Sequence, residues 1–423
     1  KYGYFPDRPS LSEGEWKRLK HYFLHSAPKQ LTQDKPEKVI ENLPLFEVKV
    51  PKFRLHPPGT SMVRIHGGNL YLGDVNQQMM YILDASLQIQ KAARVKEGAV
   101  DLQFKAGGIL LTVMGSFSPT DATSGFILNL PTETNQPPRR IVKNLKRPVD
   151  TQVADLNNDG LEDLLISEYG QWNGQLAWWE NHGKKDYEPH VLSTPSGPIK
   201  SFIRDINHDQ LPDIISLFGQ GKEGIQAFIN QGDGKFESRK IIEFPPTFGS
   251  SNLRIVDFDD DGDEDLVYTA GDNADYPPVL KPYHGIYIFL NDGNYQFNQQ
   301  HFFPLAGAYD ALAADYDQDG DTDLAAISFF PDYKQKRPLG FVFFEQLADG
   351  SFRRQTFADQ HLWGRWMVMD AGDLDEDGDL DIVLGAMAFE TTPTSPLLHQ
   401  WVEQGVPFLV LENQTLKAKE ESF

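Results

Sequence analysis

The chain has 423 residues, of which 61 are Asp or Glu and 39 are Lys or Arg, so its formal net charge is −22 at pH 7. This charge argues against binding to nucleic acid and to anionic membrane surfaces, because both are themselves negatively charged. The sequence contains no Cys, which excludes disulfides and thiol catalysis. It also lacks an apolar run of the roughly 18 residues that a membrane-spanning helix requires, so we expect no membrane insertion.

Residues 1–43 are predicted to form a short N-terminal α-helical extension. Within the segment LSEGEWKRLKHYFLHSAP, Ser12 and Glu15 have the spacing of a capping box, and Pro28 ends the pattern. The apolar face of this helix is formed by Trp16, Leu19, Tyr22 and Phe23.

This segment resembles the terminal helix of a c-type cytochrome domain, which implies a larger chain with an upstream cytochrome-like segment. No C-x-x-C-H motif is present, so packing of the helix on the flank of the following domain is the favoured alternative. His21 and His25 are spaced as a helical metal-binding pair, but no acidic third ligand lies nearby, which disfavours a metal site here.

Residues 44–147 contain strand-like segments and turn residues but no acidic loop. The segment MVRIHGGNLYLGD followed by MMYILDASLQIQKAARV alternates apolar and polar residues, and so does VDLQFKAGGILLTVMG followed by GFILNLP and RRIVKNL. We expect two repeat units here, at about residues 55–94 and 95–147.

Five acidic loops of one template, D-x-[DN]-x-D-[GQ]-x-x-D, follow and begin at residues 155, 205, 257, 315 and 373. An apolar strand leads into each loop and a buried strand leaves it, a register that a disordered acidic tract would not keep. Carboxylates at alternate positions of a tight turn converge on one point, and Ca²⁺ prefers such oxygen ligands. The sequence therefore predicts about five Ca²⁺ ions, with acidic turns that hold no metal as the alternative.

The predicted ligands are the side chains at positions one, three, five and nine of each loop and the backbone carbonyl at position seven. They are Asp155, Asn157, Asp159, Leu161 and Asp163; Asp205, Asn207, Asp209, Leu211 and Asp213; Asp257, Asp259, Asp261, Asp263 and Asp265; Asp315, Asp317, Asp319, Asp321 and Asp323; and Asp373, Asp375, Asp377, Asp379 and Asp381. The loops are not EF-hands, because their twelfth positions are not Glu and strands flank them. Gln210 replaces the Gly of the other loops, so we expect the second site to be the weakest or to be formed differently.

A period of about fifty residues with four strands per unit is typical of a β-propeller. The five loops at this spacing resemble those of FG-GAP or VCBS repeat proteins, which share the propeller of integrin α-chain heads, where equivalent loops hold Ca²⁺. The resemblance covers about residues 148–416, and it implies the fold and the metal more closely than the activity.

The fold expected is all-β, a seven-bladed β-propeller of four-stranded blades in residues 44–423. The five blades with acidic loops are expected at about 148–195, 196–245, 246–305, 306–358 and 359–416. The last unit lacks a clear fourth strand, and residues 44–50 are expected to complete it and close the ring. An eight-bladed ring or an open array is the alternative.

We expect binding on the face opposite the acidic loops, where the long second-to-third strand loops gather aromatic side chains. The candidate ligand-binding residues are Trp172, Tyr283, His284, Tyr333, Arg365 and Trp366. The ligand expected is carbohydrate or protein, bound by a secreted, monomeric module in the extracellular or periplasmic space, with the Ca²⁺ ions structural. The alternative is a calcium-bearing polysaccharide lyase or hydrolase that uses His284, Tyr283, Arg365 and Asp310. No catalytic motif was found, so an enzyme is the less favoured class.

Overall fold

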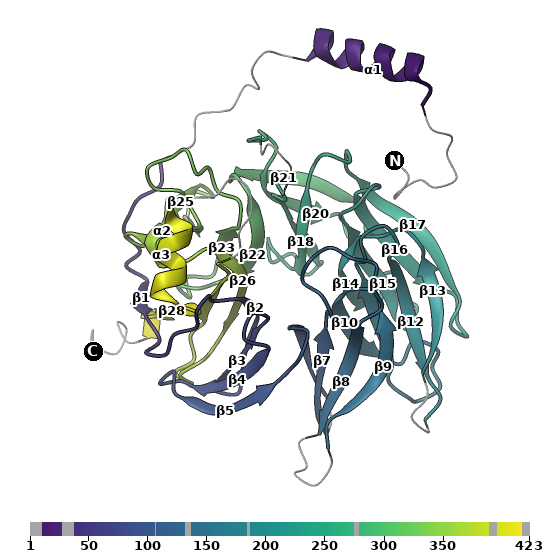
Figure 1. The fold of residues 1–423 in the computed structure, drawn as a ribbon, viewed down its shortest axis with the longest axis horizontal. Coiled ribbons are helices and arrows are strands. Elements are labelled where there is room, and N and C mark those ends of the chain that lie inside the picture. Colours follow the sequence, from purple (N-terminus) through teal and green to yellow (C-terminus); the bar gives the residue numbers. More distant parts are fainter. Residues whose placement is uncertain are drawn as a thin grey trace.

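The computed structural model describes residues 11–27, 38–105, 107–131, 137–183, 187–274, 279–388 and 396–416. It contains seven four-stranded antiparallel sheets arranged radially around a central channel (Figure 1). The predicted seven-bladed β-propeller of four-stranded blades is therefore confirmed.

Each of the first six blades takes its four strands consecutively from the chain. Blade 1 consists of β2 (Thr60–His66), β3 (Asn69–Asp74), β4 (Met79–Asp84) and β5 (Ile89–Arg94). Blade 2 consists of β6 (Ala99–Lys105), β7 (Gly108–Val113), β8 (Gly125–Pro131) and β9 (Arg139–Leu145). Blade 3 consists of β10 (Pro148–Ala154), β11 (Asp163–Glu168), β12 (Gln175–Asn181) and β13 (Tyr187–Ser193).

The next three blades repeat this order. Blade 4 consists of β14 (Pro198–Arg204), β15 (Asp213–Phe218), β16 (Gly224–Asn230) and β17 (Phe236–Glu243). Blade 5 consists of β18 (Ser250–Val256), β19 (Asp265–Ala270), β20 (Gly285–Asn291) and β21 (Phe297–Pro304). Blade 6 consists of β22 (Ala308–Ala314), β23 (Asp323–Ser328), β24 (Phe341–Gln346) and β25 (Phe352–Gln355).

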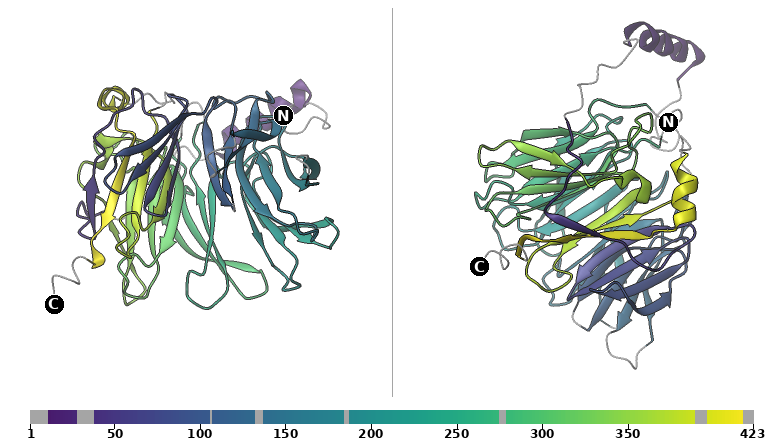
Figure 2. Two further views of the ribbon diagram at one scale, coloured as in Figure 1. Left: turned by 90° about the horizontal axis from the view of Figure 1, so that it is seen from below. Right: turned by 90° about the vertical axis from the view of Figure 1, so that its left-hand side faces the viewer.

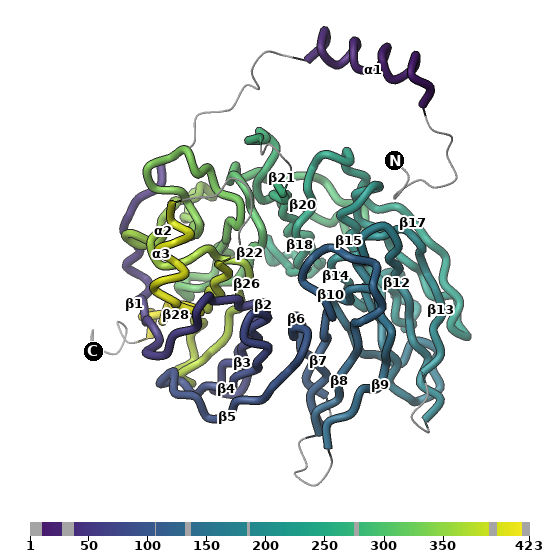
Figure 3. The backbone as a smooth tube through the Cα atoms, viewed as in Figure 1, coloured from purple at the N-terminus to yellow at the C-terminus, as the bar shows by residue number. Residues whose placement is uncertain are grey.

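Blade 7 joins the two ends of the propeller sequence. It consists of β26 (Trp366–Gly372), β27 (Asp381–Ala386), β28 (Phe408–Asn413) and β1 (Phe46–Lys49). Strand β1 pairs antiparallel with β28 from Phe46↔Asn413 to Lys49↔Val410, so a segment near the start of the chain supplies the outermost strand. The backbone trace shows these two ends lying side by side (Figure 3).

The first strand of every blade lines the channel, and these strands contact their counterparts in the neighbouring blades. Each of them carries a β-bulge between its first and third residues. Apolar side chains fill the spaces between adjacent blades, as at blades 6 and 7, where Tyr316, Phe343 and Trp366 belong to one buried cluster. Such a bulge changes the direction of the side chain at the third position of each first strand.

The N-terminal helix α1 (Glu13–Ser26) forms as predicted, but it does not pack on the propeller. Its capping box is present, with the Glu15 backbone N–H donating to Ser12 Oγ at 3.3 Å and the Ser12 N–H donating to Glu15 Oε2 at 2.8 Å. No residue of α1 is buried, and the helix lies apart from the blades (Figures 1 and 2). The expectation that it packs on the propeller's flank is therefore wrong. Pro28, expected to end the helix, lies outside the described residues.

Two further helices lie at blade 7, α2 (Gln360–Trp363) and α3 (Leu397–Gln404). They contact each other, and the Trp401 indole N–H donates to the His361 carbonyl oxygen at 2.9 Å. Among the described residues, no helix is long and apolar enough to cross a membrane.

Candidate functional site

In each of the five acidic loops, which join the first strand of a blade to the second, Oδ2 of the first Asp accepts the backbone N–H of the residue five positions later. In the loop at 257, the two carboxylate oxygens of Asp257 accept the backbone N–H groups of Asp261 at 3.1 Å and Gly262 at 3.0 Å. Asp261 Oδ1 in turn accepts the N–H of Asp263 at 2.9 Å. The turn thus holds the alternate carboxylates over one centre.

Three of the loops bring three carboxylate oxygens within 4.8 Å of one another. The groups are Asp257, Asp259 and Asp265; Asp315, Asp317 and Asp319; and Asp373, Asp375 and Asp377. In the loops at 155 and 205 the third position is Asn157 or Asn207, whose side-chain oxygen accepts the N–H of Asp159 at 3.1 Å or of Asp209 at 3.0 Å.

The electrostatics of these loops fit a divalent cation. Asp321 Oδ1, Asp373 Oδ1 and Asp379 Oδ1 are buried and have no hydrogen-bond partner. Burial, followed by repulsion from Asp319, raises the pKa of Asp317 to about 6. Carboxylates in such surroundings are costly when ionised, and a bound Ca²⁺ would supply the missing positive charge and oxygen-seeking partner.

The ninth residue of each loop has a second role that the sequence pattern did not reveal. Asp265 is 1% exposed, and its two oxygens accept the N–H groups of Phe258 and Asn291, both at 2.8 Å. The equivalent carboxylates of Asp163, Asp213, Asp323 and Asp381 are bonded in the same way. Burial raises the pKa of Asp323 to about 8 and that of Asp381 to about 7. This residue therefore ties the loop to the third strand, besides any contact with a metal.

The second loop keeps the common turn although Gln210 replaces glycine. Gln210 has φ +70°, beside +86° for Gly160 and +95° for Gly262, and its N–H donates to Asp205 Oδ2 at 2.9 Å. The expectation that this loop could be formed differently is wrong, whereas weaker metal binding there stays a prediction. A left-handed residue also occurs at position four of every loop, namely Asn158, His208, Asp260, Gln318 and Glu376.

On the opposite face, most of the six predicted ligand-binding side chains are used in packing. Trp366 is fully buried at 0% exposure, and His284 and Arg365 are 3% and 5% exposed. The Arg365 guanidinium lies 3.7 Å over the Phe329 ring and donates through Nε to the Phe329 carbonyl oxygen at 2.7 Å. These three side chains therefore expose almost none of their surface on this face, and a role for them in ligand binding stays a prediction.

The remaining three predicted residues are accessible to different extents. Tyr283 and Tyr333 are half-buried; the Tyr283 ring stacks on Phe248 at 4.9 Å, and its hydroxyl donates to the Thr247 carbonyl oxygen at 3.0 Å. Trp172 is 45% exposed. Its loop is held by Asp121 Oδ1, which accepts the backbone N–H groups of residues 171, 172 and 173 at 2.9–3.0 Å.

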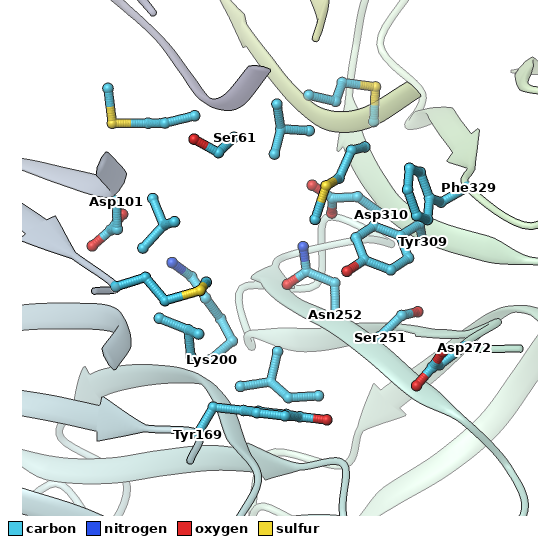
Figure 4. Close-up of a pocket in the computed structure, with 18 of the residues that line it drawn as sticks. Ser61, Asp101, Tyr169, Lys200, Ser251, Asn252, Asp272, Tyr309, Asp310 and Phe329 are labelled. Carbon is cyan, nitrogen blue, oxygen red and sulfur yellow. The ribbon is translucent and has the colours of Figure 1, made fainter. Parts of the chain in front are cut away.

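A cavity of about 380 Å³ occupies the channel, and ion pairs between blades surround it. Arg64 of blade 1 contacts Asp101 of blade 2 at 3.4 Å and Asp370 of blade 7 at 3.1 Å. Lys200 pairs with Asp150 at 2.5 Å, and Arg254 with Asp310 at 2.5 Å (Figure 4 shows Asp101, Lys200 and Asp310). The carboxylates also accept backbone N–H groups of the next blade, as Asp370 does from Ile65 at 2.7 Å.

These channel charges therefore join adjacent blades. Asp310, one of the suspected catalytic residues, is paired with Arg254 in this ring. Among the charged residues of this ring, Asp101, Asp150 and Asp370 were not predicted from the sequence. A charged residue at the third or fifth position of each first strand was the available signal.

Comparisons with known proteins agree with this arrangement. A model described as an FG-GAP-like repeat matches residues 155–216 and 205–268, which contain the first three acidic loops. Two proteins named T-cell immunomodulatory protein homolog are similar, one from Plasmodium yoelii yoelii (28% identity, 42% of this chain, 29% of the relative) and one from Plasmodium falciparum isolate 3D7 (25% identity, 54% of this chain, 37% of the relative). The matched region thus spans about a third of these relatives.

Among solved structures, an ancestral GH74 enzyme matches with a TM-score of 0.54 and 10% identity over 89% of this chain and 50% of that chain. The N-terminal domain of Nup159 matches with a TM-score of 0.47 and 10% identity over 90% of this chain and 99% of that chain. At such identity the first likeness concerns the fold alone.

Proposed function

Because the chain is a seven-bladed β-propeller that carries FG-GAP-like repeats, we propose that it is an exported, calcium-stabilised interaction module whose long-loop face binds another protein. The observation that carries this proposal is the convergence of three carboxylate oxygens within 4.8 Å in the loops at 257, 315 and 373. In the last two of these loops, Asp321 Oδ1, Asp373 Oδ1 and Asp379 Oδ1 are buried without a hydrogen-bond partner. Ca²⁺ loops of modest affinity, about 10⁻⁴–10⁻³ M, are filled outside cells and not in a cytosol.

The residues proposed to hold Ca²⁺ are the side chains at positions one, three and five of each loop, with the position-seven carbonyl and the ninth carboxylate as further candidates. Bound Ca²⁺ would neutralise the clustered charges and join the first strand of a blade to the second. The ninth carboxylate already joins the loop to the third strand through backbone N–H groups. Together these contacts hold the blades rigid, so that the opposite face can present its loops in fixed positions.

Two observations support a protein partner over a carbohydrate or an enzymatic substrate. Of the six predicted ligand-binding side chains, Trp172 alone is exposed, so the row of stacking platforms expected for sugar rings is not formed by these residues. His284 and Arg365, two of the suspected catalytic residues, are buried among loop side chains.

The test is a binding screen of the full chain, in calcium, against an array of extracellular protein domains. We expect Trp172→Ala to lower the affinity for a bound domain about tenfold, because a partly exposed aromatic side chain often anchors a protein interface. Val191→Ala is the matched control, because Val191 is 50% exposed on the outer strand β13. Equal loss in both variants, or release of sugar products from polysaccharides by the protein, would overturn the proposal.

A further inference from the structure

Neighbouring acidic loops are joined in two places by a buried asparagine that ends a third strand. Asn413, the last residue of β28 in blade 7, is 0% exposed, and its side-chain amide donates to the Tyr316 carbonyl oxygen at 2.8 Å. Tyr316 is position two of the loop at 315, which belongs to blade 6. The same amide donates to the Leu380 carbonyl oxygen of the loop at 373 at 3.2 Å. Asn413 therefore holds both loops at once.

The backbone groups of Asn413 and Tyr316 extend this connection to the ninth carboxylate of each loop. The Asn413 N–H donates to Oδ1 of Asp381, the ninth residue of the loop at 373, at 2.9 Å. The Tyr316 N–H donates to Oδ2 of Asp323, the ninth residue of the loop at 315, at 3.3 Å. A chain of hydrogen bonds thus leads from one predicted calcium ligand to another in the next blade.

Two further hydrogen bonds cross between these loops. The Thr415 hydroxyl donates to the Tyr316 carbonyl oxygen at 3.2 Å. The side-chain amide of Gln318, position four of the loop at 315, donates to the Gly378 carbonyl oxygen of the loop at 373 at 3.3 Å. The Tyr316 ring is 0% exposed and packs edge-on against Phe343 at 5.6 Å, so it cannot turn away without disturbing the core between the blades.

The loops at 155 and 205 are connected in the same way. Asn230, the last residue of β16 in blade 4, is 2% exposed, and its amide donates to the Leu156 carbonyl oxygen of blade 3 at 3.0 Å. Its N–H donates to Asp213 Oδ1 at 2.6 Å, and the Leu156 N–H donates to Asp163 Oδ2 at 3.0 Å. The ninth carboxylates of these two loops are therefore also joined.

The loop at 257 differs, because this connection is missing on both of its sides. Asn291, the equivalent residue of blade 5, donates through its amide to the Glu264 carbonyl oxygen of its own loop at 3.2 Å. Blade 6 has Gln346 at the equivalent place, where its N–H donates to the ninth carboxylate of its own loop. Within the described part of the chain, no hydrogen bond joins Asn291 to Ile206 or Gln346 to Phe258, the position-two residues of the preceding loops.

We propose that the loops at 315 and 373 bind Ca²⁺ cooperatively, with Asn413 as the residue that couples them, and that Asn230 couples the loops at 155 and 205. A ninth carboxylate that ligates Ca²⁺ is held in place, and so are the peptide groups bonded to it and to the asparagine. The neighbouring loop then has less conformational freedom to lose when it binds, which is positive cooperativity. The inference rests on the proposed calcium binding. It makes blade 7, which closes the ring, respond to calcium over a narrower concentration range.

The experiment is a calcium titration of the full chain by isothermal calorimetry, with chosen loops emptied by Asp→Asn at position five. In all five loops, Oδ1 of this residue accepts the N–H of position seven, a hydrogen bond that Asn can keep. The variant D159N/D209N/D261N retains the loops at 315 and 373. We expect it to bind calcium with a Hill coefficient of about 1.4, which corresponds to about fivefold coupling between two sites.

The matched control is D159N/D209N/D377N, which retains the loops at 257 and 315. These loops also lie in adjacent blades and have Asp at positions one, three, five and nine, but the asparagine connection is missing between them. We expect a Hill coefficient of about 1 or below, because an ion in one loop makes the potential at the other less negative. The same repulsion acts in the first variant, so the difference between the two isolates the hydrogen bonds.

Asn413→Ala, added to D159N/D209N/D261N, should lower the Hill coefficient to that of the control. Q318A/T415V in the same background removes two cross-loop hydrogen bonds and keeps Asn413, so it should give an intermediate value and serves if Asn413→Ala does not fold. Thermal melting checks the folding of each variant.

A coefficient no higher in the first variant than in the control would overturn the inference. So would a lower mean affinity with an unchanged coefficient in both the Asn413→Ala and the Q318A/T415V variants, because Asn413 would then act on its own loop alone. Absence of calcium binding by the unsubstituted chain would refute the proposed calcium role as well, whereas calcium bound without cooperativity refutes the coupling alone.

Discussion

Calcium should raise the thermal stability of this protein by a large and calculable amount. The perturbation is the change from excess EGTA to about 10 mM Ca²⁺, far above the range of about 10⁻⁴–10⁻³ M in which extracellular loops of this kind bind. A ligand that binds the folded state alone stabilises it by RT ln(1 + [L]/Kd), which is about 1.4 to 2.7 kcal/mol for each loop under these conditions. The five loops together then contribute about 7 to 14 kcal/mol.

The unfolding entropy of the propeller determines how far this free energy shifts the melting temperature. The ordered propeller, from β1 to β28, covers roughly 370 residues, and an unfolding entropy of about 2.1 cal/mol/K per residue gives about 0.8 kcal/mol/K for the domain. The melting temperature should therefore rise by about 10–20 °C in calcium. Asp319→Asn should remove about a fifth of the rise, because Asp319 belongs to one of the groups of converging oxygens.

The assay is differential scanning calorimetry, paired with a metal count on the dialysed protein. Asp349→Asn serves as the control, because Asp349 lies in a turn outside the acidic loops and its carboxylate accepts hydrogen bonds from Ser351. The reasoning would be refuted by two results together: a rise in melting temperature of less than about 2 °C, and no metal bound to the dialysed protein. The loops would then be acidic turns that hold no metal.

Three further substitutions test the loop backbone, the channel and the closure of the ring. Gln210→Gly should stabilise the protein by about 1 kcal/mol in denaturant titrations, since Gln210 has the left-handed φ of +70°. Gly262→Gln should destabilise it by a similar amount through backbone strain alone, since nothing lies within 4 Å of the added Cβ. Effects of the opposite signs would refute the strain at this loop position. Asp370→Ala should cost about 1–3 kcal/mol by the same titration, because it leaves the buried Ile65 N–H without its acceptor, while Arg64 keeps Asp101 as an acidic partner at 3.4 Å; an unchanged midpoint would mean that Asp370 does not join blades 1 and 7. Phe46→Ala should also cost about 3–5 kcal/mol, since Phe46 is 6% exposed and packs against Phe343 at 5.4 Å, and an unchanged midpoint would argue against the closure by β1.

The sequence was sufficient to predict the propeller because its signals are local and repeated. Each acidic loop and the strand after it occupy fourteen consecutive residues, and five copies fix the period. The channel ion pairs were not predictable in this way, because Arg64 and Asp370 are separated by 306 residues and meet through the ring alone.

The long-loop face shows the same limit. Tyr283 and Phe248 lie in different loops, and their rings stack at 4.9 Å. From the sequence alone, the Tyr283 ring could equally have been exposed to solvent. His284 and Arg365 were judged from residue type, whereas their burial depends on neighbouring loops. Trp172 differs because Asp121, fifty residues earlier, fixes the backbone of its loop and leaves the indole outside.

The pairing of β1 with β28 has a mechanical consequence. Phe46, the first residue of β1, lies opposite Asn413, the last residue of β28, so a pull on the chain before β1 and after β28 reaches the pair at the same end. Antiparallel hydrogen bonds lie across the strands, and a load applied there opens them one after another instead of shearing all of them together. Under such a pull we therefore expect blade 7 to open before the six blades built from consecutive strands.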